Sequence, residues 1–164
     1  MLPAGISKLL TRAKALLASL FGAGSESDTQ RLNIDVVTEH PETGVFALIL
    51  VETGPWAPGT EDAELRRIQS RLYDCVDVAV DGQFAATYPK SVGRPVRIQL
   101  DTYDIPEERV RPFFDRFADH VSKWPEIQQG LQAKQNVTSL MFQYNARVID
   151  GNLSQQSRGG PTKG

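Results

Sequence analysis

The chain has 164 residues, of which 40% are hydrophobic and 23% charged, a composition typical of a globular protein in water. This length favours one domain, and a single cysteine excludes a disulfide framework and a cysteine-based zinc site. The formal charge of −2 argues against a general nucleic-acid binder, and no apolar run approaches the roughly 20 residues that cross a bilayer.

The charge is divided unevenly along the chain. Residues 1–24 contain Lys8, Arg12 and Lys14 but no acidic residue, so this head carries +3. The remainder holds 15 basic and 20 acidic residues. A basic head on an acidic body indicates two parts with different roles.

Residues 1–21 are predicted to form an amphipathic helix. Its apolar residues recur at spacings of three and four, which places them on one face. They are Ile6, Leu9, Leu10, Ala13, Leu16, Leu17, Leu20 and Phe21. Residues 22–30 are small and polar, as in a flexible linker. Because a helix this short is marginal alone in water, its apolar face must pack against something.

Four interpretations of that face remain open. In three of them the face packs on the protein's own core or on a second copy of the same helix, on an anionic membrane surface, or in a groove on another protein. In the fourth, the segment is a targeting segment similar to a transit peptide. Three cationic residues would give only weak and reversible membrane binding. The residues expected to contact a membrane or a partner helix are Lys8, Leu9, Arg12, Leu16, Leu17, Leu20 and Phe21.

The body begins with a predicted β-hairpin. Residues 31–40 alternate apolar and polar side chains, which predicts a half-buried strand, and residues 41–44 supply turn-forming Pro and Gly. Residues 45–52 are apolar on both faces, as expected of a central strand. The inward residues of the first strand are expected to be Leu32, Ile34 and Val36.

A Pro- and Gly-rich loop at residues 53–60 holds Trp56 between two prolines. A rigid loop that presents an aromatic side chain suits an interface anchor, although the indole could instead fold back onto the core. Thr60 is predicted to cap a helix that runs to about Val80. The expected inward residues of this helix are Leu65, Ile68, Leu72, Cys75, Val76 and Ala79.

Three carboxylates, those of Asp74, Asp77 and Asp81, share one face of this helix. They form either a solvated acidic face, a binding face for a basic partner, or a site for a hard cation that needs further oxygen ligands. The basic head of the same chain is one candidate for the basic partner. Cys75 is expected to be a small buried hydrophobe rather than a reactive thiol.

The second half of the chain contains predicted helix ends and another stretch in which apolar and polar residues alternate. Residues 81–83 are expected to break the helix, and Tyr88-Pro89 and Trp124-Pro125 to terminate helices. Residues 94–103 predict a strand with Val96, Ile98 and Leu100 inward and a wet opposite face that holds Arg97, Gln99 and Asp101.

A further helix is expected after Asp104, which stands three residues before Glu107 in the capping-box spacing. Pro112 within it predicts a kink or a restart. Residues 138–148 predict the last strand, and the glycine-rich residues 151–164 a disordered tail.

This order of elements predicts an α+β fold. We expect residues 31–150 to form a single domain with a four-stranded mixed sheet, in which a hairpin is followed by strand–helix–strand crossovers. Two helices should pack on one face of the sheet, in addition to the N-terminal amphipathic helix.

Four segments resemble a widespread bacterial family of small uncharacterised proteins, a domain of unknown function, over about residues 34–103. They are Val51-Glu52-x-x-Pro55-Trp56, Asp81-Gly82-Gln83, Tyr88-Pro89 and Arg94-Pro95-Val96-Arg97-Ile98. The resemblance implies a bacterial, cytoplasmic setting and an autonomous domain, and it implies no catalytic residues.

The sequence carries no catalytic signature. Its glycines are scattered rather than gathered in a phosphate-binding loop, and His40 and His120 are separated by about 80 positions. We therefore expect no catalytic, metal or cofactor site, and predict a non-enzymatic protein-interaction or regulatory domain with a protein partner.

Two alternatives to an interaction domain remain open. One is a membrane-peripheral adaptor tethered by residues 1–21, and the other is an enzyme with a composite site near His40 or His120. The predicted location is cytoplasmic, with membrane contact if the head binds lipid. Self-association through the N-terminal helix is a further expectation.

Overall fold

The computed structural model describes residues 34–149. The helix predicted at residues 1–21, the linker at 22–30 and the tail at 151–164 lie outside the described residues. Residues 31–33 of the first predicted strand, and residues 31 and 150 at which the predicted domain begins and ends, also lie outside the described residues.

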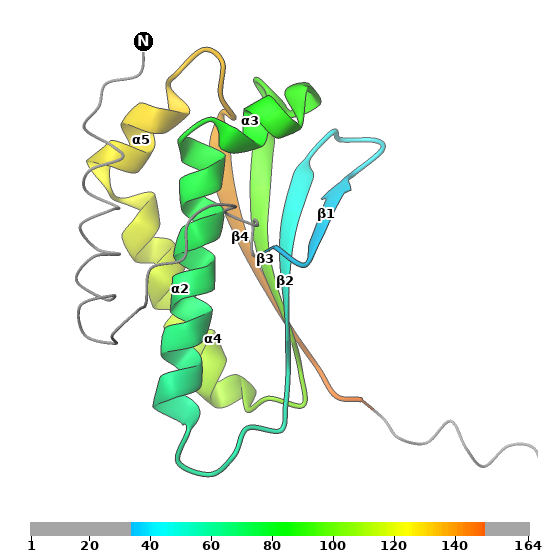
Figure 1. The fold of residues 1–164 in the computed structure, drawn as a ribbon, viewed down its shortest axis with the longest axis vertical. Coiled ribbons are helices and arrows are strands. Elements are labelled where there is room, and N and C mark those ends of the chain that lie inside the picture. Colours follow the sequence, from blue (N-terminus) through cyan, green and yellow to red (C-terminus); the bar gives the residue numbers. More distant parts are fainter. Residues whose placement is uncertain (1–33, 150–164) are drawn as a thin grey trace, which may run out of the picture.

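Four strands form one mixed sheet: β1 (Val36–Glu39), β2 (Phe46–Thr53), β3 (Pro95–Tyr103) and β4 (Ser139–Arg147). They lie side by side in chain order, with β1 antiparallel to β2 and the other neighbours parallel. Figure 1 shows β4 at one edge of this sheet and the hairpin of β1 and β2 at the other. The predicted hairpin and the predicted mixed sheet are confirmed.

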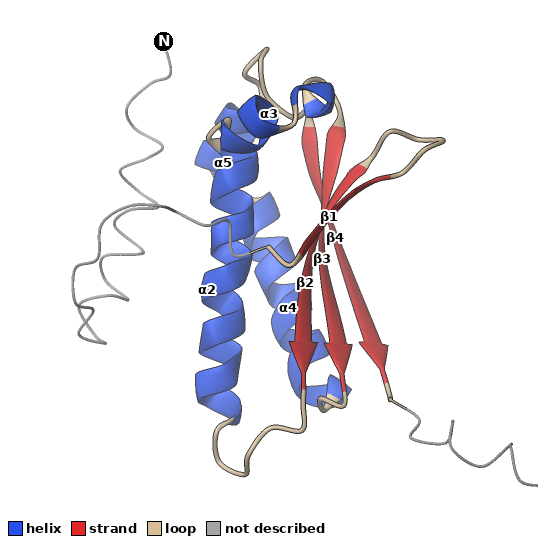
Figure 2. Ribbon diagram, turned by 45° about the vertical axis from the view of Figure 1, so that its right-hand side comes forward, coloured by secondary structure: helices blue, strands red, loops and turns tan. Residues whose placement is uncertain are grey.

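The connections between the parallel strands are helical. α2 (Glu61–Val80), α3 (Gln83–Thr87) and the short 3₁₀ helix η1 (Pro89–Ser91) lead from β2 to β3, while α4 (Glu107–Ser122) and α5 (Pro125–Leu131) lead from β3 to β4. Successive crossovers of one hand that advance in one direction place their helices on the same face. Figures 1 and 2 show this one-sided helical layer, which confirms the α+β class.

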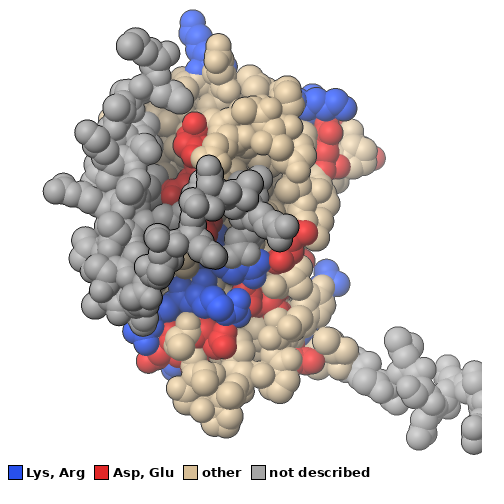
Figure 3. All heavy atoms as spheres, viewed as in Figure 1, with Lys and Arg blue, Asp and Glu red and all other residues tan. Residues whose placement is uncertain are grey.

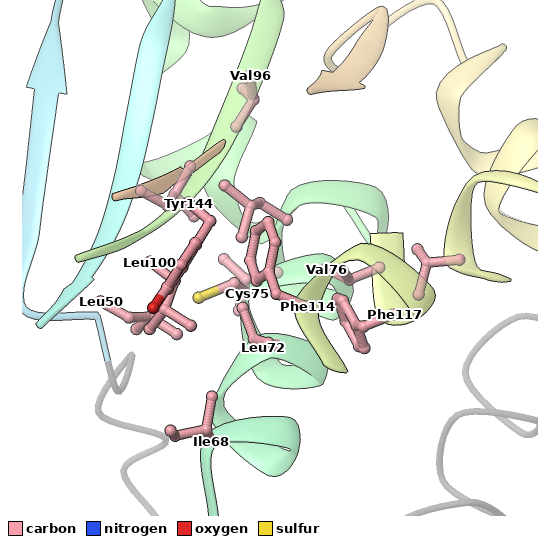
Figure 4. Close-up of a cluster of buried hydrophobic side chains, with 14 of the residues drawn as sticks. Leu50, Ile68, Leu72, Cys75, Val76, Val96, Leu100, Phe114, Phe117 and Tyr144 are labelled. Carbon is pink, nitrogen blue, oxygen red and sulfur yellow. The ribbon is translucent and has the colours of Figure 1, made fainter. Parts of the chain in front are cut away.

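The hydrophobic core lies between the sheet and the helices (Figure 4). Five of the six predicted inward residues of α2 are fully buried, and Leu65 packs half-buried beside them. The three predicted inward residues of β3 are also fully buried. Each large apolar side chain removed from water contributes about 1.5–3 kcal/mol. The main members of this core are Leu48, Leu50, Ile68, Leu72, Val76, Ile98, Leu100, Val110, Phe114 and Phe117.

The prediction that Val36 faces inward together with Ile34 is wrong. Ile34 and Val37 pack against the core, whereas Val36 is 43% exposed on the other face of the sheet. The chain bends at Asp35, whose carboxylate accepts a hydrogen bond from Arg71 of α2 (2.7 Å), so β1 begins only after it. A bend of one residue transfers every following side chain to the opposite face.

Both predicted helix caps are wrong in detail. The Thr60 hydroxyl donates to the carbonyl of Ala57 (2.7 Å) instead of accepting a hydrogen bond from the first turn of α2. Asp104 has a left-handed backbone (φ 54°), and its carboxylate accepts the N–H of Ile149 (2.9 Å). Asp104 therefore links the end of β3 to the residues that follow β4, and Pro106 occupies the N-cap of α4.

The sequence does not predict α5. α4 ends at Ser122, just before Trp124-Pro125, as expected, but Pro125 also occupies the first turn of a new helix, where its missing N–H costs no hydrogen bond. Pro112 lies inside α4, which continues through it without a restart.

Candidate functional site

The face of the sheet opposite the helices is one candidate binding surface, because no described helix covers it (Figure 2). Strand alternation places on it every residue that does not point into the core. We call this surface the open face. It includes Val36, Ala47, Ile49, Val51, Arg97, Gln99, Asp101, Met141, Gln143 and Asn145.

A hydrogen-bonded row of polar side chains crosses the open face. Asp101 Oδ1 accepts from Gln99 Nε2 (2.9 Å) and from Asn145 Nδ2 (2.7 Å). Asn145 Oδ1 accepts in turn from Gln143 Nε2 (3.1 Å). The predicted side of β3 is confirmed, but Gln99 and Asp101 are buried rather than wet. Neighbouring side chains shield the inner strand β3, and the network holds the amides in fixed orientations.

β4 is an edge strand that pairs with β3 on one side and with no described strand on the other. The N–H of Asp104 donates to the carbonyl of Arg147 (3.1 Å), so the backbone groups of Arg147 face β3. By alternation along the strand, those of the even-numbered residues face away from β3. These residues are Leu140, Phe142, Tyr144 and Ala146.

This edge lacks the features that protect sheet edges from pairing. β4 contains no Pro or Lys, and its one charged residue is Arg147 at its end. Met141 is 39% exposed, and Val148 and Ile149, which follow the strand, are 78% and 60% exposed. β1, at the other edge, has only four residues and ends in Glu39. Within residues 34–149, β1 combines outward backbone groups with one exposed apolar residue, Val36, over four residues, whereas β4 offers a nine-residue edge with three exposed apolar residues on it or directly after it.

Trp56 lies half-buried in the loop before α2 and packs against the core. Its indole Nε1 is buried and has no hydrogen-bond partner within residues 34–149. The loop thus folds the indole inward, the alternative weighed from the sequence. A role for Trp56 in binding stays a prediction.

Asp74, Asp77 and Asp81 are all half-buried along α2, whose last turn holds no basic residue. Asp81 accepts hydrogen bonds from the backbone N–H of Gln83 (2.8 Å) and from its side chain (2.6 Å). The three carboxylates add to the negative end of the helix dipole. Within residues 34–149, no group of three or more His, Cys, Asp or Glu side chains is placed to hold a metal ion.

The two histidines make separate local hydrogen bonds. His40 Nδ1 accepts from the N–H of Thr43 (3.3 Å) in the turn between β1 and β2, and His120 Nε2 accepts from the indole Nε1 of Trp124 (3.0 Å). α4, which carries His120, packs on β4 at the far edge of the sheet from this turn. The structure therefore does not bring the two imidazoles together.

Cys75 is fully buried under α2 (Figure 4). Burial, with a smaller contribution from Asp74, raises the pKa of its thiol to about 12. Because the thiolate is the reactive species, we expect no modification of the native chain by a maleimide at pH 8, and complete modification in denaturant. Intact mass spectrometry measures both states, and rapid labelling of the native chain would contradict the expectation.

Sequence reasoning missed a buried ion-pair network at the end of β2. The buried Glu52 accepts hydrogen bonds from Arg71 and from Arg67 Nη2 (2.5 Å), and Arg71 also binds Asp35. Burial lowers the pKa of Arg71, but the hydrogen bonds that it donates to Asp35 and Glu52 outweigh this effect and leave its pKa raised. In Figure 3, basic and acidic side chains adjoin on this side of the molecule. The network therefore keeps Arg71 charged and ties the residue before β1 and the end of β2 to α2.

A second candidate surface is a shallow groove of about 190 Å³ between α2 and α4. It is lined by Gln69, Tyr73, Phe113, Arg116, Phe117 and His120. The Tyr73 ring lies 4.9 Å from that of Phe117 and is stacked at 5.8 Å on that of Trp124. We call this surface the aromatic groove.

Comparison with protein-family models, with curated proteins and with solved structures found no match to the chain. The resemblance to a bacterial family over about residues 34–103 therefore stays a prediction, and the function is argued from the geometry alone. None of the helices within residues 34–149 combines the length and the apolar character needed to cross a bilayer.

Proposed function

We propose that this protein is a non-enzymatic protein-interaction domain, in which β4 binds an extended segment of a partner protein as an additional strand. The single observation that supports this function is the unprotected nine-residue edge of β4. In strand addition, main-chain hydrogen bonds provide affinity, and contacts of alternate side chains provide specificity.

The side chains beside the edge define the chemistry of the partner strand. On the helical side, Leu140 and Phe142 are only half-buried, so an apolar residue of the partner would cover them. On the open face, Gln143 and Asn145 present oriented amides. A segment that alternates apolar residues with Thr, Asn or Gln fits both sides.

Replacing Met141 by lysine is expected to weaken partner binding about tenfold or more, because a charge at a strand edge opposes pairing. Val36→Lys is the matched control, since Val36 is similarly exposed on the same face but lies on β1. Substitutions at such exposed positions change stability by only about 0.5 kcal/mol. Quantitative mass spectrometry of proteins captured by the wild-type chain and the two variants measures the effect.

The supporting result is a protein retained by the wild-type chain and by Val36→Lys but lost with Met141→Lys. In that complex, hydrogen exchange should slow at residues 140, 142, 144 and 146, whose outward N–H groups would become bonded. Equal capture by all three chains, or protection confined to another element, contradicts strand addition along β4.

The two alternative functions depend on other parts of the chain. Tethering to a membrane rests on residues 1–21, which lie outside the described residues, and stays a prediction. A composite catalytic site at His40 or His120 gains no support from the geometry of residues 34–149, because each imidazole makes a local hydrogen bond in a different part of the fold.

A further inference from the structure

We propose that residues 6–21 of this chain bind, as an amphipathic helix, across the aromatic groove of their own molecule and cover it with their apolar face. The fold would then have three layers: the sheet, the helices α2 and α4, and the N-terminal helix. This inference is independent of strand addition at β4, which lies on the other side of the helical layer.

The groove offers apolar surface that the described core does not cover. Tyr73 and Phe113, which line the groove, pack against the core from the outside and remain half-buried, as does Trp124, which stacks on Tyr73. Two helices side by side leave a furrow between their side-chain ridges, and a third helix fits such a furrow. Eight apolar residues at helical spacing within residues 6–21 supply the complementary face.

Charge complementarity favours the head as the occupant. Asp77 stands one turn after Tyr73 on α2, so the acidic face of α2 borders the groove. Residues 72–81 contain three acidic residues and no basic one, at the negative end of the helix dipole. Residues 1–24 contain three basic residues and no acidic one.

One basic residue of the described chain, Arg116, lines the groove. The long aliphatic stem of an arginine can cover apolar surface while its guanidinium group stays in water. Arg116 is therefore compatible with an apolar occupant.

The connecting segment is long enough for binding within one molecule. Asp35, next to the first described residue, is hydrogen-bonded to Arg71 of α2, so the chain enters the fold beside that helix. The twelve residues 22–33 span about 40 Å when extended. α2 itself is about 30 Å long, and a 16-residue helix about 24 Å.

Binding within one molecule also has a concentration advantage. A short flexible linker presents its attached segment at an effective concentration in the millimolar range. A membrane held by three cationic residues, at about 1 kcal/mol each, competes weakly with that arrangement. The same molecule is therefore the favoured partner over a second copy or a lipid surface.

A spin label on α2 tests the proposal in the full-length chain. Ala63 is exposed in the first turns of α2 and does not line the groove, so a label attached at Ala63→Cys does not block the groove. Native Cys75 is buried and stays unlabelled. We expect the amide signals of residues 6–21 to broaden in the ¹⁵N spectrum, independently of dilution, and to recover when the label is reduced.

Two matched variants test which face makes the contact. Leu16→Glu places a charge on the apolar face and is expected to abolish the broadening, while Ser19→Glu places the same charge on the polar face and is expected to retain it. In Leu16→Glu the amide signals of the groove-lining residues, such as Tyr73 and Phe113, should shift as the helix leaves, while those of the sheet should stay unchanged. In Ser19→Glu both sets of signals should stay as in the wild-type chain.

Three outcomes would overturn the proposal. They are unbroadened signals for residues 6–21, broadening that survives Leu16→Glu, and broadening that appears only between molecules when a spin-labelled chain is mixed with a ¹⁵N chain. The last outcome would assign the groove to a second copy. None of them bears on β4, whose test uses other variants.

Discussion

Replacing Arg71 by methionine is expected to lower the free energy of unfolding by about 3 kcal/mol. The substitution leaves the buried carboxylate of Glu52 without one of its two cationic partners, while Arg67 still binds it. Because that second pair survives, the loss should fall at the lower end of the range of about 3–5 kcal/mol for broken buried pairs. Urea unfolding of the full chain measures the change as a shift in midpoint at constant slope.

The double variant Arg71→Met with Glu52→Leu separates the ion pair from simple packing. Replacing both members of a buried pair by apolar residues of similar size is often neutral, because no charge is then left in the interior. We therefore expect the double variant to be more stable than Arg71→Met alone. A double variant that is as unstable as the sum of the two single variants would show that the network contributes through packing instead.

Replacing Asn136 by alanine is expected to cost about 3 kcal/mol. This buried side chain donates to the carbonyls of Val80 (2.6 Å) and Gly130 (3.1 Å) and accepts from the N–H of Val137 (2.8 Å). It thereby joins the ends of α2 and α5 to the segment before β4. Each buried backbone group that loses its partner costs about 1–3 kcal/mol, and part of the loss is recovered by local relaxation.

Two further variants define this effect in thermal unfolding. Asn136→Asp keeps the size and can accept the N–H of Val137, but an ionised carboxylate cannot donate to two carbonyls, so it should be similarly destabilising. Gln128→Ala removes one exposed bond to the carbonyl of Ser122 and should cost less than about 0.5 kcal/mol. If Asn136→Ala changed stability as little as Gln128→Ala, these three bonds would not stabilise the fold.

The regular elements were predictable because their signals are local. Alternation at residues 94–103 and helical spacing at 60–80 depend only on near neighbours, and both predictions are confirmed. Local sequence patterns gave wrong predictions where a side chain forms a hydrogen bond with a residue far away in the sequence. Asp104 has the spacing of a helix cap, but its carboxylate binds Ile149, 45 residues away. Asp35 ends an apparent alternation because Arg71, 36 residues away, holds it.

The candidate site was predictable only in part. Residues 138–148 read correctly as a strand, but its position at the edge of the sheet depends on strand order, which no local pattern encodes. Glu52 closes an apolar run without any sign in the sequence that Arg67 and Arg71 would reach it. Proline is common both just after the end of a helix and in the first turn of a new one. The sequence signal at Pro125 was read only as a helix end, which explains why α5 was missed.

The agreement between strand order and chain order has a consequence for synthesis on the ribosome. Each new strand is laid beside the one made just before it, so that the nascent chain can grow its sheet from one side without threading a later strand between earlier ones. Until residues 139–147 emerge, β3 is itself the edge strand of the incomplete sheet. Any delay between the emergence of β3 and that of β4 would thus lengthen the time in which the incomplete molecule can aggregate with others.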